Sequence, residues 1–190
     1  MRSSDIDILM VPGWSNSGPD HWQSRWERKL STARRVEQDD WDSPQREAWI
    51  GRVVSLIGAC TRPVVVVAHS LGIATVAHAL PLLPAGRVAG AFMVAPPSDE
   101  FMAREPAIAA FAPYPRSPLP VRAMLVASQN DPTCPFIEAT TLAAAWGARV
   151  SDAGEAGHIN GQSGHGPWPE GLLAFAGFLK SLSAQPQAPA

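Results

Sequence analysis

Apolar residues gather along this chain in short runs of the length of a buried β-strand. Six such runs occur, the second of them weak, at residues 6–11, 34–38, 64–69, 88–95, 122–128 and 148–153. Most are continuously apolar rather than alternating, which is typical of parallel strands that are covered on both faces. The pattern predicts an α/β fold, a doubly wound and mostly parallel sheet of about six strands with helices on both faces.

Helical patterns separate most of the strand-like runs. Residues 19–33 begin with Pro19 and Asp20 in the expected first turn, and residues 44–59 follow Ser43, a candidate N-cap. Before the tail, apolar residues recur at helical spacing and predict a C-terminal helix that lies on the sheet. Strands that alternate with helices favour the same parallel architecture.

Two segments interrupt this alternation. Residues 96–120 contain seven prolines, which exclude a long helix or a central strand, although residues 105–111 could form one short helix. We interpret the segment as an excursion over the carboxyl edge of the sheet, and both a small cap and an ordinary surface loop fit its composition. Residues 183–190 are rich in small residues and proline and are expected to be a disordered tail, so the predicted single domain covers residues 1–182.

Composition and charge narrow the classes of function. The 190 residues are 46% hydrophobic and 17% charged, with a formal net charge of −2, which suits one core and one domain. No run of five like charges occurs, so we expect a small-molecule substrate and neither nucleic acid nor membrane as a partner. The N-terminus lacks the apolar region of a signal peptide and no 18-residue apolar span occurs, so a cytoplasmic location is expected.

Motifs for cofactors and metals are missing from the sequence. Cys60 and Cys134 lack the CxxC spacing of a zinc or redox site and are expected to be two reduced thiols. Neither GxGxxG nor GxxxxGKS/T is present, and no group of His, Cys and Asp has the spacing of metal ligands. The sequence therefore predicts chemistry carried by side chains, with no cofactor and no metal.

Ser70 lies where the most hydrophobic strand-like run ends and a helix begins. Ligands bind outside the carboxyl ends of the strands in open α/β sheets. Residues 68–72, AHSLG, match the nucleophile-elbow pattern G-x-S-x-G with alanine for the first glycine. Both ends of this turn require small residues because the chain nearly touches itself there. An ordinary serine cap at a helix start explains the same residues, so the motif alone leaves both interpretations open.

A serine nucleophile needs a base, and the base needs an acid that orients it. Asp131 follows the fifth strand-like run, and His158 lies in a glycine-rich loop after the last one. The order Ser70, Asp131, His158 is that of the catalytic triad in this fold. His165 shares the loop of His158 and is the alternative base, whereas His69 is expected to point away from the serine.

Backbone N–H groups near the serine are candidates for an oxyanion hole. The N–H of Leu71 directly follows the nucleophile, and that of Trp14 lies in the sharp turn after the first strand-like run. The Trp14 indole would then wall the substrate pocket. Alternatively, this side chain is part of the core, although three polar residues follow it.

Longer motifs carry a family likeness over about residues 6–182. They are VPGWSNSGPDHWQSRWE, DDWDSP, VVVAHSLG, SQNDPTCPF and GHINGQSGHGPWPEG. Within them, G-P-x-H-W-Q and G-H-I-N are specific, because they are not general features of α/β hydrolases. Together these stretches resemble the small serine hydrolases of the α/β-hydrolase superfamily related to the retinoblastoma-binding protein 9 group.

The resemblance implies a compact α/β-hydrolase fold with a minimal lid or none. It implies Ser70 as nucleophile, Asp131 as acid and His158 as base, and the alanine at the start of the elbow leaves this assignment intact. It also implies that three aromatic residues line or support the substrate pocket: His21, Trp22 and Trp41. The two tryptophans could equally be core residues.

The expected function is that of an esterase-type serine hydrolase, which forms an acyl-enzyme on small ester, thioester or amide substrates. The alternative is a protein-binding module that keeps a hydrolase fold with an idle or weakly active site, for a partner that the sequence does not specify. The short proline-rich segment leaves little length for a lipase-type lid, so short acyl groups are the expected substrates.

Overall fold

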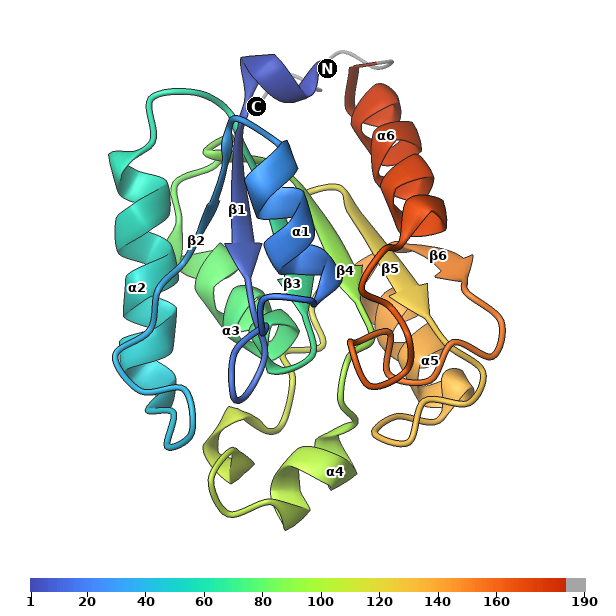
Figure 1. Ribbon diagram of the computed structural model, residues 1–190. Helices are drawn as coiled ribbons and strands as arrows, with labels where there is room; N and C mark the ends of the chain where they lie inside the picture. The colour runs from blue at the N-terminus through green and yellow to red at the C-terminus, as the bar shows by residue number, and fades with distance from the viewer. Residues whose placement is uncertain (184–190) are drawn as a thin grey trace.

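The computed structural model describes residues 1–183, so positions 184–190 of the predicted tail lie outside the described residues. One sheet of six parallel strands has the order β2-β1-β3-β4-β5-β6 (Figure 1). Its strands are β1 (Asp7–Val11), β2 (Ala33–Arg35), β3 (Val64–His69), β4 (Val88–Val94), β5 (Ala123–Ala127) and β6 (Arg149–Asp152). The α-helices are α1 (Trp22–Lys29), α2 (Arg46–Ala59), α3 (Leu71–Ala79), α4 (Asp99–Arg104), α5 (Phe136–Trp146) and α6 (Pro169–Ser183), and the short 3-10 helices are η1 (Ser3–Asp5), η2 (Leu80–Leu82) and η3 (Ala109–Phe111). The predicted α/β architecture is confirmed, and every strand pairs in parallel.

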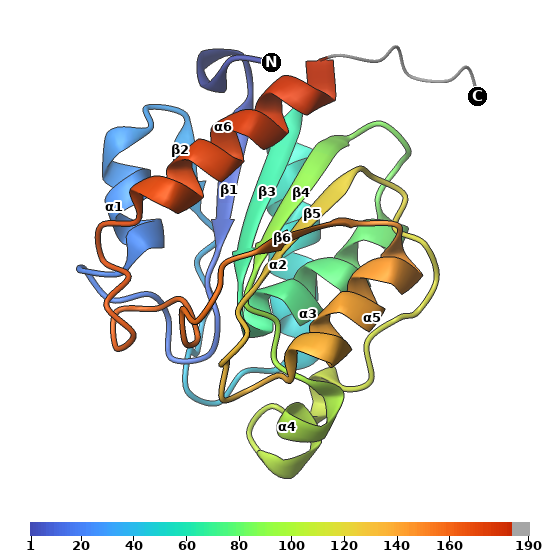
Figure 2. The same cartoon turned by 90° about the vertical axis from the view of Figure 1, so that its right-hand side faces the viewer.

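Each face of the sheet carries its own apolar core. Along β3, alternate residues belong to different cores: Val64, Val66 and Ala68 to one, Val65 and Val67 to the other. Helices α2, α3 and α5 cover the first face, and α1 and α6 cover the second (Figure 2). Every residue of β3 is buried because both faces are covered, which explains its continuous apolar run.

Helix α1 is shorter than predicted and begins at Trp22. Pro19 and Asp20, expected in its first turn, lie in the preceding turn instead. His21 is the N-cap: its ring Nδ1 accepts a hydrogen bond from the backbone N–H of Gln23. A side-chain acceptor at this position satisfies one of the unpaired N–H groups of the first helical turn, so the helix starts after it.

Helix α2 begins at Arg46, and its N-cap is Gln45 rather than the predicted Ser43. The reason lies in the preceding turn. The carboxylate of Asp40 accepts hydrogen bonds from the backbone N–H groups of Asp42 and Ser43, at 2.9 and 2.8 Å. Because Ser43 is held in this turn, the helix cannot start until the turn is complete.

The proline-rich segment 96–120 is a packed structure at the carboxyl side of the sheet, where α4 and η3 lie (Figure 1). The short helix expected over 105–111 forms only as η3. Helix α4 forms before it, where the Ser98 hydroxyl caps the first turn by accepting a hydrogen bond from the N–H of Phe101. Met102, Ile108 and Phe111 are buried. This segment is therefore anchored by its own apolar residues. No helix within residues 1–183 is both long and apolar enough to cross a membrane.

Candidate active site

Ser70 lies in a sharp turn between β3 and α3, with a backbone φ of 53° and ψ of −128°. A non-glycine residue in this region is strained, and such strain persists where the surrounding structure imposes it. Here the constraint is close packing: a Cβ on Gly72 would lie 2.3 Å from the carbonyl oxygen of Val11. The Ala68 methyl, in contrast, is accommodated in the core. Position 72, after the serine, therefore requires glycine, while position 68, before it, accommodates the methyl group of alanine.

Ser70, His158 and Asp131 form a chain of hydrogen bonds across the carboxyl edge of the sheet. The Ser70 Oγ lies 2.9 Å from Nε2 of His158. On the other side of the ring, Nδ1 lies 2.9 Å from Oδ2 and 3.0 Å from Oδ1 of Asp131. The side chain of Asp131 is only 3% exposed and that of His158 13%. The structure therefore places a hydroxyl, an imidazole and a shielded carboxylate in the order that nucleophilic catalysis requires.

The acid and base loops are tied to each other by residues that the sequence analysis missed. The backbone N–H and the hydroxyl of Thr133 both lie 2.9 Å from Oδ1 of Asp131. Oδ1 of Asn130 accepts a hydrogen bond of 2.6 Å from the N–H of Gly157. These contacts hold the carboxylate of Asp131 and the backbone beside His158 in fixed relative positions. The Asp-Pro-Thr sequence indicates the turn in which Asp131 accepts from the N–H of Thr133. The contact between Asn130 and Gly157 joins residues 27 positions apart, so it has no local signal in the sequence.

The ring of His69 lies beside that of His158, and the ring of His21 lies beside that of His69. The Nε2 of His69 is 2.9 Å from the backbone oxygen of His158, and it must donate because a carbonyl only accepts. Burial lowers the pKa of His69 well below its ordinary value. Burial, aided by the positive charge of Arg35, lowers the pKa of His21 to about 4. Both rings are thus neutral at pH 7, and His69 supports the loop that carries His158.

His165, the alternative base of the sequence analysis, is not in contact with Ser70. Its Nδ1 lies 3.1 Å from the hydroxyl of Ser163, and its ring lies against Trp168. The backbone oxygen of His165 accepts from the N–H of Trp22. The structure thus places His158, and not His165, next to the serine.

The two candidate oxyanion donors belong to residues near Ser70: Leu71 follows it in the chain, and Trp14 lines the same cavity. Leu71 is the first residue of α3, and the N–H groups of a first helical turn have no partner within the helix. Within residues 1–183, the backbone N–H of Trp14 donates no hydrogen bond. The adjacent Gly13 lies so close to the nucleophile that a Cβ there would be 3.2 Å from Ser70 Oγ. Both N–H groups are therefore available near the serine.

A cavity of about 420 Å³ opens beside Ser70. It is lined by residues of the β1, β3 and β6 loops: Gly13, Trp14, Ser15, Asn16, Gly18, Pro19, Asp20, His21, His69, Ser70, His158, Asn160, Gly161 and Gln162. Trp14 and His21 are the pocket residues that the sequence predicts, whereas Asn16, Asn160 and Gln162 are not predicted. No residue of the segment 96–120 lines this cavity.

Trp22 and Trp41, expected to line or support the pocket, lie behind its wall. Trp22 is fully buried and donates its indole N–H to the backbone oxygen of Ile159, at 2.8 Å, beside His158. The backbone oxygen of Trp41 accepts from the N–H of Ser15, and its ring packs against Trp49. Both residues therefore hold loops that line the cavity without lining it themselves.

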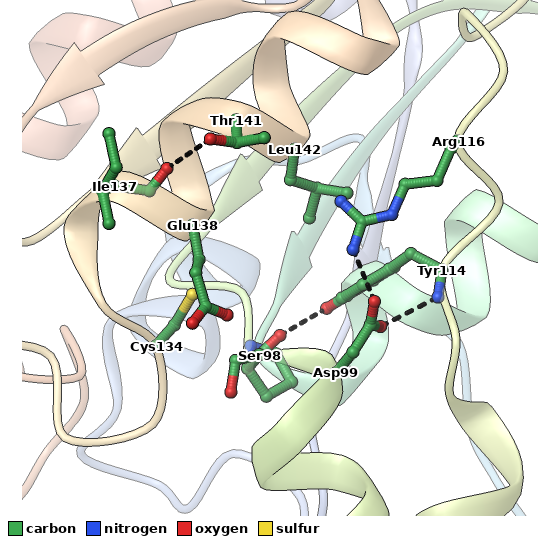
Figure 3. Close-up of a pocket in the computed structure, with 10 residues that line it drawn as sticks. Ser98, Asp99, Tyr114, Arg116, Cys134, Ile137, Glu138, Thr141 and Leu142 are labelled. Atoms are coloured by element: carbon green, nitrogen blue, oxygen red, sulfur yellow. Dashed lines mark hydrogen bonds and ion pairs between the residues drawn. The ribbon is translucent and has the colours of Figure 1, made fainter.

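A second, smaller cavity of about 260 Å³ lies between α4 and α5 (Figure 3). Its wall includes Asp99, which pairs with Arg116, and the buried thiol of Cys134. Burial raises the pKa of this thiol to about 12, so it stays protonated and unreactive at pH 7. Among the described residues, no hydroxyl or thiol that lines this cavity is hydrogen-bonded to a carboxylate or a histidine. Within residues 1–183, no group of three or more His, Cys, Asp and Glu side chains is placed to hold a metal ion.

Comparison with known proteins shows the family and the fold. The profile of the serine hydrolase family matches residues 8–177. A YdeN-like hydrolase from Pectobacterium atrosepticum is 35% identical over 95% of this chain and 94% of its own, with a TM-score of 0.84. A hydrolase of the α/β superfamily from Xanthomonas campestris is 22% identical over 93% of this chain and 99% of its own, with a TM-score of 0.65. A thermophilic esterase from Thermogutta terrifontis is 15% identical over 93% of this chain and 90% of its own, with a TM-score of 0.67. Curated protein sequences gave no significant match. The chain therefore belongs to the serine hydrolase family and has the fold of the α/β hydrolases.

Proposed function

We propose that this protein hydrolyses small ester, thioester or amide substrates through an acyl-enzyme on Ser70. The observation that carries the proposal is the contact of 2.9 Å between the Ser70 hydroxyl and Nε2 of His158, whose other nitrogen faces the shielded carboxylate of Asp131. A serine hydroxyl is a poor nucleophile unless an adjacent base accepts its proton.

In the first half of the reaction, Nε2 of His158 takes the hydroxyl proton while Ser70 Oγ forms a bond to the substrate carbonyl carbon. The Asp131 carboxylate holds the ring in the tautomer that leaves Nε2 free and stabilises the imidazolium. The backbone N–H groups of Trp14 and Leu71 bind the oxyanion. The bond to the leaving group then breaks as His158 returns the proton to it. Water attacks the acyl-enzyme by the same route and releases the acid and the free serine.

Several features support a small-molecule substrate of the esterase type. The open cavity of about 420 Å³ beside Ser70 is of the size that encloses small ligands. Two structural relatives are named esterases, although at 15% and 13% identity these likenesses show the fold alone. Within the family, the G-P-x-H-W-Q and G-H-I-N motifs favour a place near the retinoblastoma-binding protein 9 group.

Labelling with a fluorophosphonate probe tests the proposal. We expect the wild-type protein to be labelled on Ser70 and the Ser70→Ala variant to stay unlabelled, while circular dichroism shows both to be folded. Labelling that mass spectrometry maps to Ser15, Ser17 or Ser163 would refute the assignment of the nucleophile. A folded wild-type protein that is never labelled would instead support a binding module with an idle site.

A further inference from the structure

The cavity beside Ser70 combines apolar ring surface with polar side chains and backbone. None of the residues that line it carries an aliphatic side chain of the Ala, Val, Leu, Ile or Met type. Trp14 and Pro19 supply its apolar surface, and the rest are glycines and polar residues. An acyl pocket for alkyl chains is normally lined by hydrophobic and aromatic side chains. The composition of this wall therefore points away from a purely alkyl substrate.

Two asparagines in this wall have side-chain oxygens that are already occupied. Oδ1 of Asn16 accepts hydrogen bonds of 2.7 Å from both the N–H of Ser17 and Nη1 of Arg35. Oδ1 of Asn160 accepts one of 3.0 Å from the N–H of Ser163. Because these donors identify the oxygen, the other end of each amide is the NH₂ group. Within residues 1–183, neither NH₂ group has a hydrogen-bond partner.

The charges around the cavity favour a neutral ligand. No lysine or arginine lines it, so a carboxylate or phosphate would find no cation there. Asp20 is its one carboxylate, and this side chain is 87% exposed and paired with Arg25. What the wall offers in excess is N–H donors: the NH₂ groups of Asn16 and Asn160, and the buried Nε2–H of His21, which has no partner within residues 1–183. A donor is best satisfied by an oxygen acceptor.

We propose that the natural substrate carries a neutral oxygen acceptor, an ether, hydroxyl or carbonyl oxygen, close to the bond that is cleaved. The NH₂ groups of Asn16 and Asn160 bind this oxygen and determine specificity. The inference rests on the proposed function and deepens it from any small acyl compound to an oxygen-bearing one. A site built to form hydrogen bonds discriminates against an analogue that lacks the acceptor, because its polar groups are left unpaired.

A pair of isosteric esters tests this inference. In p-nitrophenyl methoxyacetate an ether oxygen replaces one methylene of p-nitrophenyl butyrate, and the two esters share their leaving group. The rate of acylation is read from the p-nitrophenol burst, so slow deacylation does not interfere. The ether oxygen makes methoxyacetate more reactive even without the enzyme. The ratio of the two enzymatic rates is therefore divided by the ratio of the rates at which hydroxide hydrolyses the same two esters. We expect a corrected preference for methoxyacetate of about tenfold, the scale of one hydrogen bond of about 1.4 kcal/mol.

Asn16→Asp and Asn160→Asp are the matched variants. Each keeps a side-chain oxygen for the partners of Oδ1 and replaces the NH₂ donor by an acceptor. Both esters are neutral, so the added charge acts on both rates alike and cancels in the ratio. We expect the corrected preference to fall to about one in the double variant. Gln45→Glu, the same type of change at an exposed position outside the cavity, should leave the preference unchanged.

The outcomes separate this inference from the proposed function. A corrected ratio of about one in the wild type, or a preference that survives in the double variant, would overturn the inference while acylation of Ser70 still supports the function. Labelling of Ser70 by a fluorophosphonate without acylation by either ester would also overturn the inference, because the cavity would then not accept an acyl group of this shape. Absence of both labelling and acylation would refute the proposed function itself.

Discussion

Adding one methyl group to Gly13 should displace the nucleophile, because the methyl group would crowd the side chain of Ser70. A Cβ at this position would lie 2.7 Å from Cβ of Ser70. Favourable contacts between carbon atoms occur at about 3.5 to 4.0 Å, so Gly13 and Ser70 would have to separate by about 1 Å. A misplacement of about 1 Å in a catalytic arrangement can lower the rate about 10²-fold, which corresponds to about 2.7 kcal/mol in the activation barrier. We therefore expect kcat/KM of Gly13→Ala to fall about 100-fold.

Gly18→Ala is the matched control for this experiment. Gly18 lines the same cavity and lies in the same loop, but a Cβ there would meet no atom within 4 Å. We expect its kcat/KM on p-nitrophenyl acetate to stay within about threefold of the wild type, because the added methyl group meets nothing. Thermal unfolding of both variants shows whether the change is local. Equal activity of Gly13→Ala and wild type, or an equal loss in Gly18→Ala, would refute the argument from close packing at the elbow.

Three further predictions concern the acid, the buried histidine and the acyl chain. Asp131→Asn should remain folded yet lower kcat about 10⁴-fold, which is the scale for loss of the carboxylate that sets the histidine tautomer. A loss below tenfold would point to another acid, and Asp152 would be the first to test. The pKa of His21 is about 4 in the folded protein against an ordinary 6.5, so the unfolded chain binds the proton first and stability is lost as the pH falls from 6.5 towards 4. The free energy of unfolding is measured with urea at pH 7.5 and at pH 5. Between these two values it should fall by about 2 kcal/mol more for the wild type than for His21→Gln, and equal decreases would contradict the pKa of His21. Among p-nitrophenyl esters below their critical micelle concentrations, kcat/KM should peak at acyl groups of about two to four carbons, because the cavity has no aliphatic wall against which more methylenes could pack. A steady rise to octanoate would reveal an acyl tunnel.

The sequence predicts the positions of the strands and of three side chains because both follow from simple rules. Covered parallel strands must be apolar throughout, and their carboxyl ends meet at one edge of the sheet. Ser70, Asp131 and His158 each follow a strand, so they could be expected to lie together. In the structure they are joined by hydrogen bonds of 2.9 to 3.0 Å.

What the sequence does not predict depends on partners that are distant in the chain. Asn16 is one of three asparagines in the sequence, and nothing in the sequence shows that Arg35 fixes its side-chain oxygen. The start of α2 depends on the Asp40 turn, which occupies the N–H of Ser43. The resemblance implies that Trp22 lines or supports the pocket, and hydropathy does not distinguish these two roles; in the structure Trp22 is a buried support.

The contact between Ser70 and His158 also has a consequence for biosynthesis. It joins residues 88 positions apart, and the strands that carry them pair only with other distant segments. Parallel strands cannot close by a local hairpin, so such contacts form late and slowly. A nascent chain on the ribosome therefore has the turn at Ser70 but not His158 until that residue has been synthesised, and the two side chains can meet only when the sheet is nearly complete.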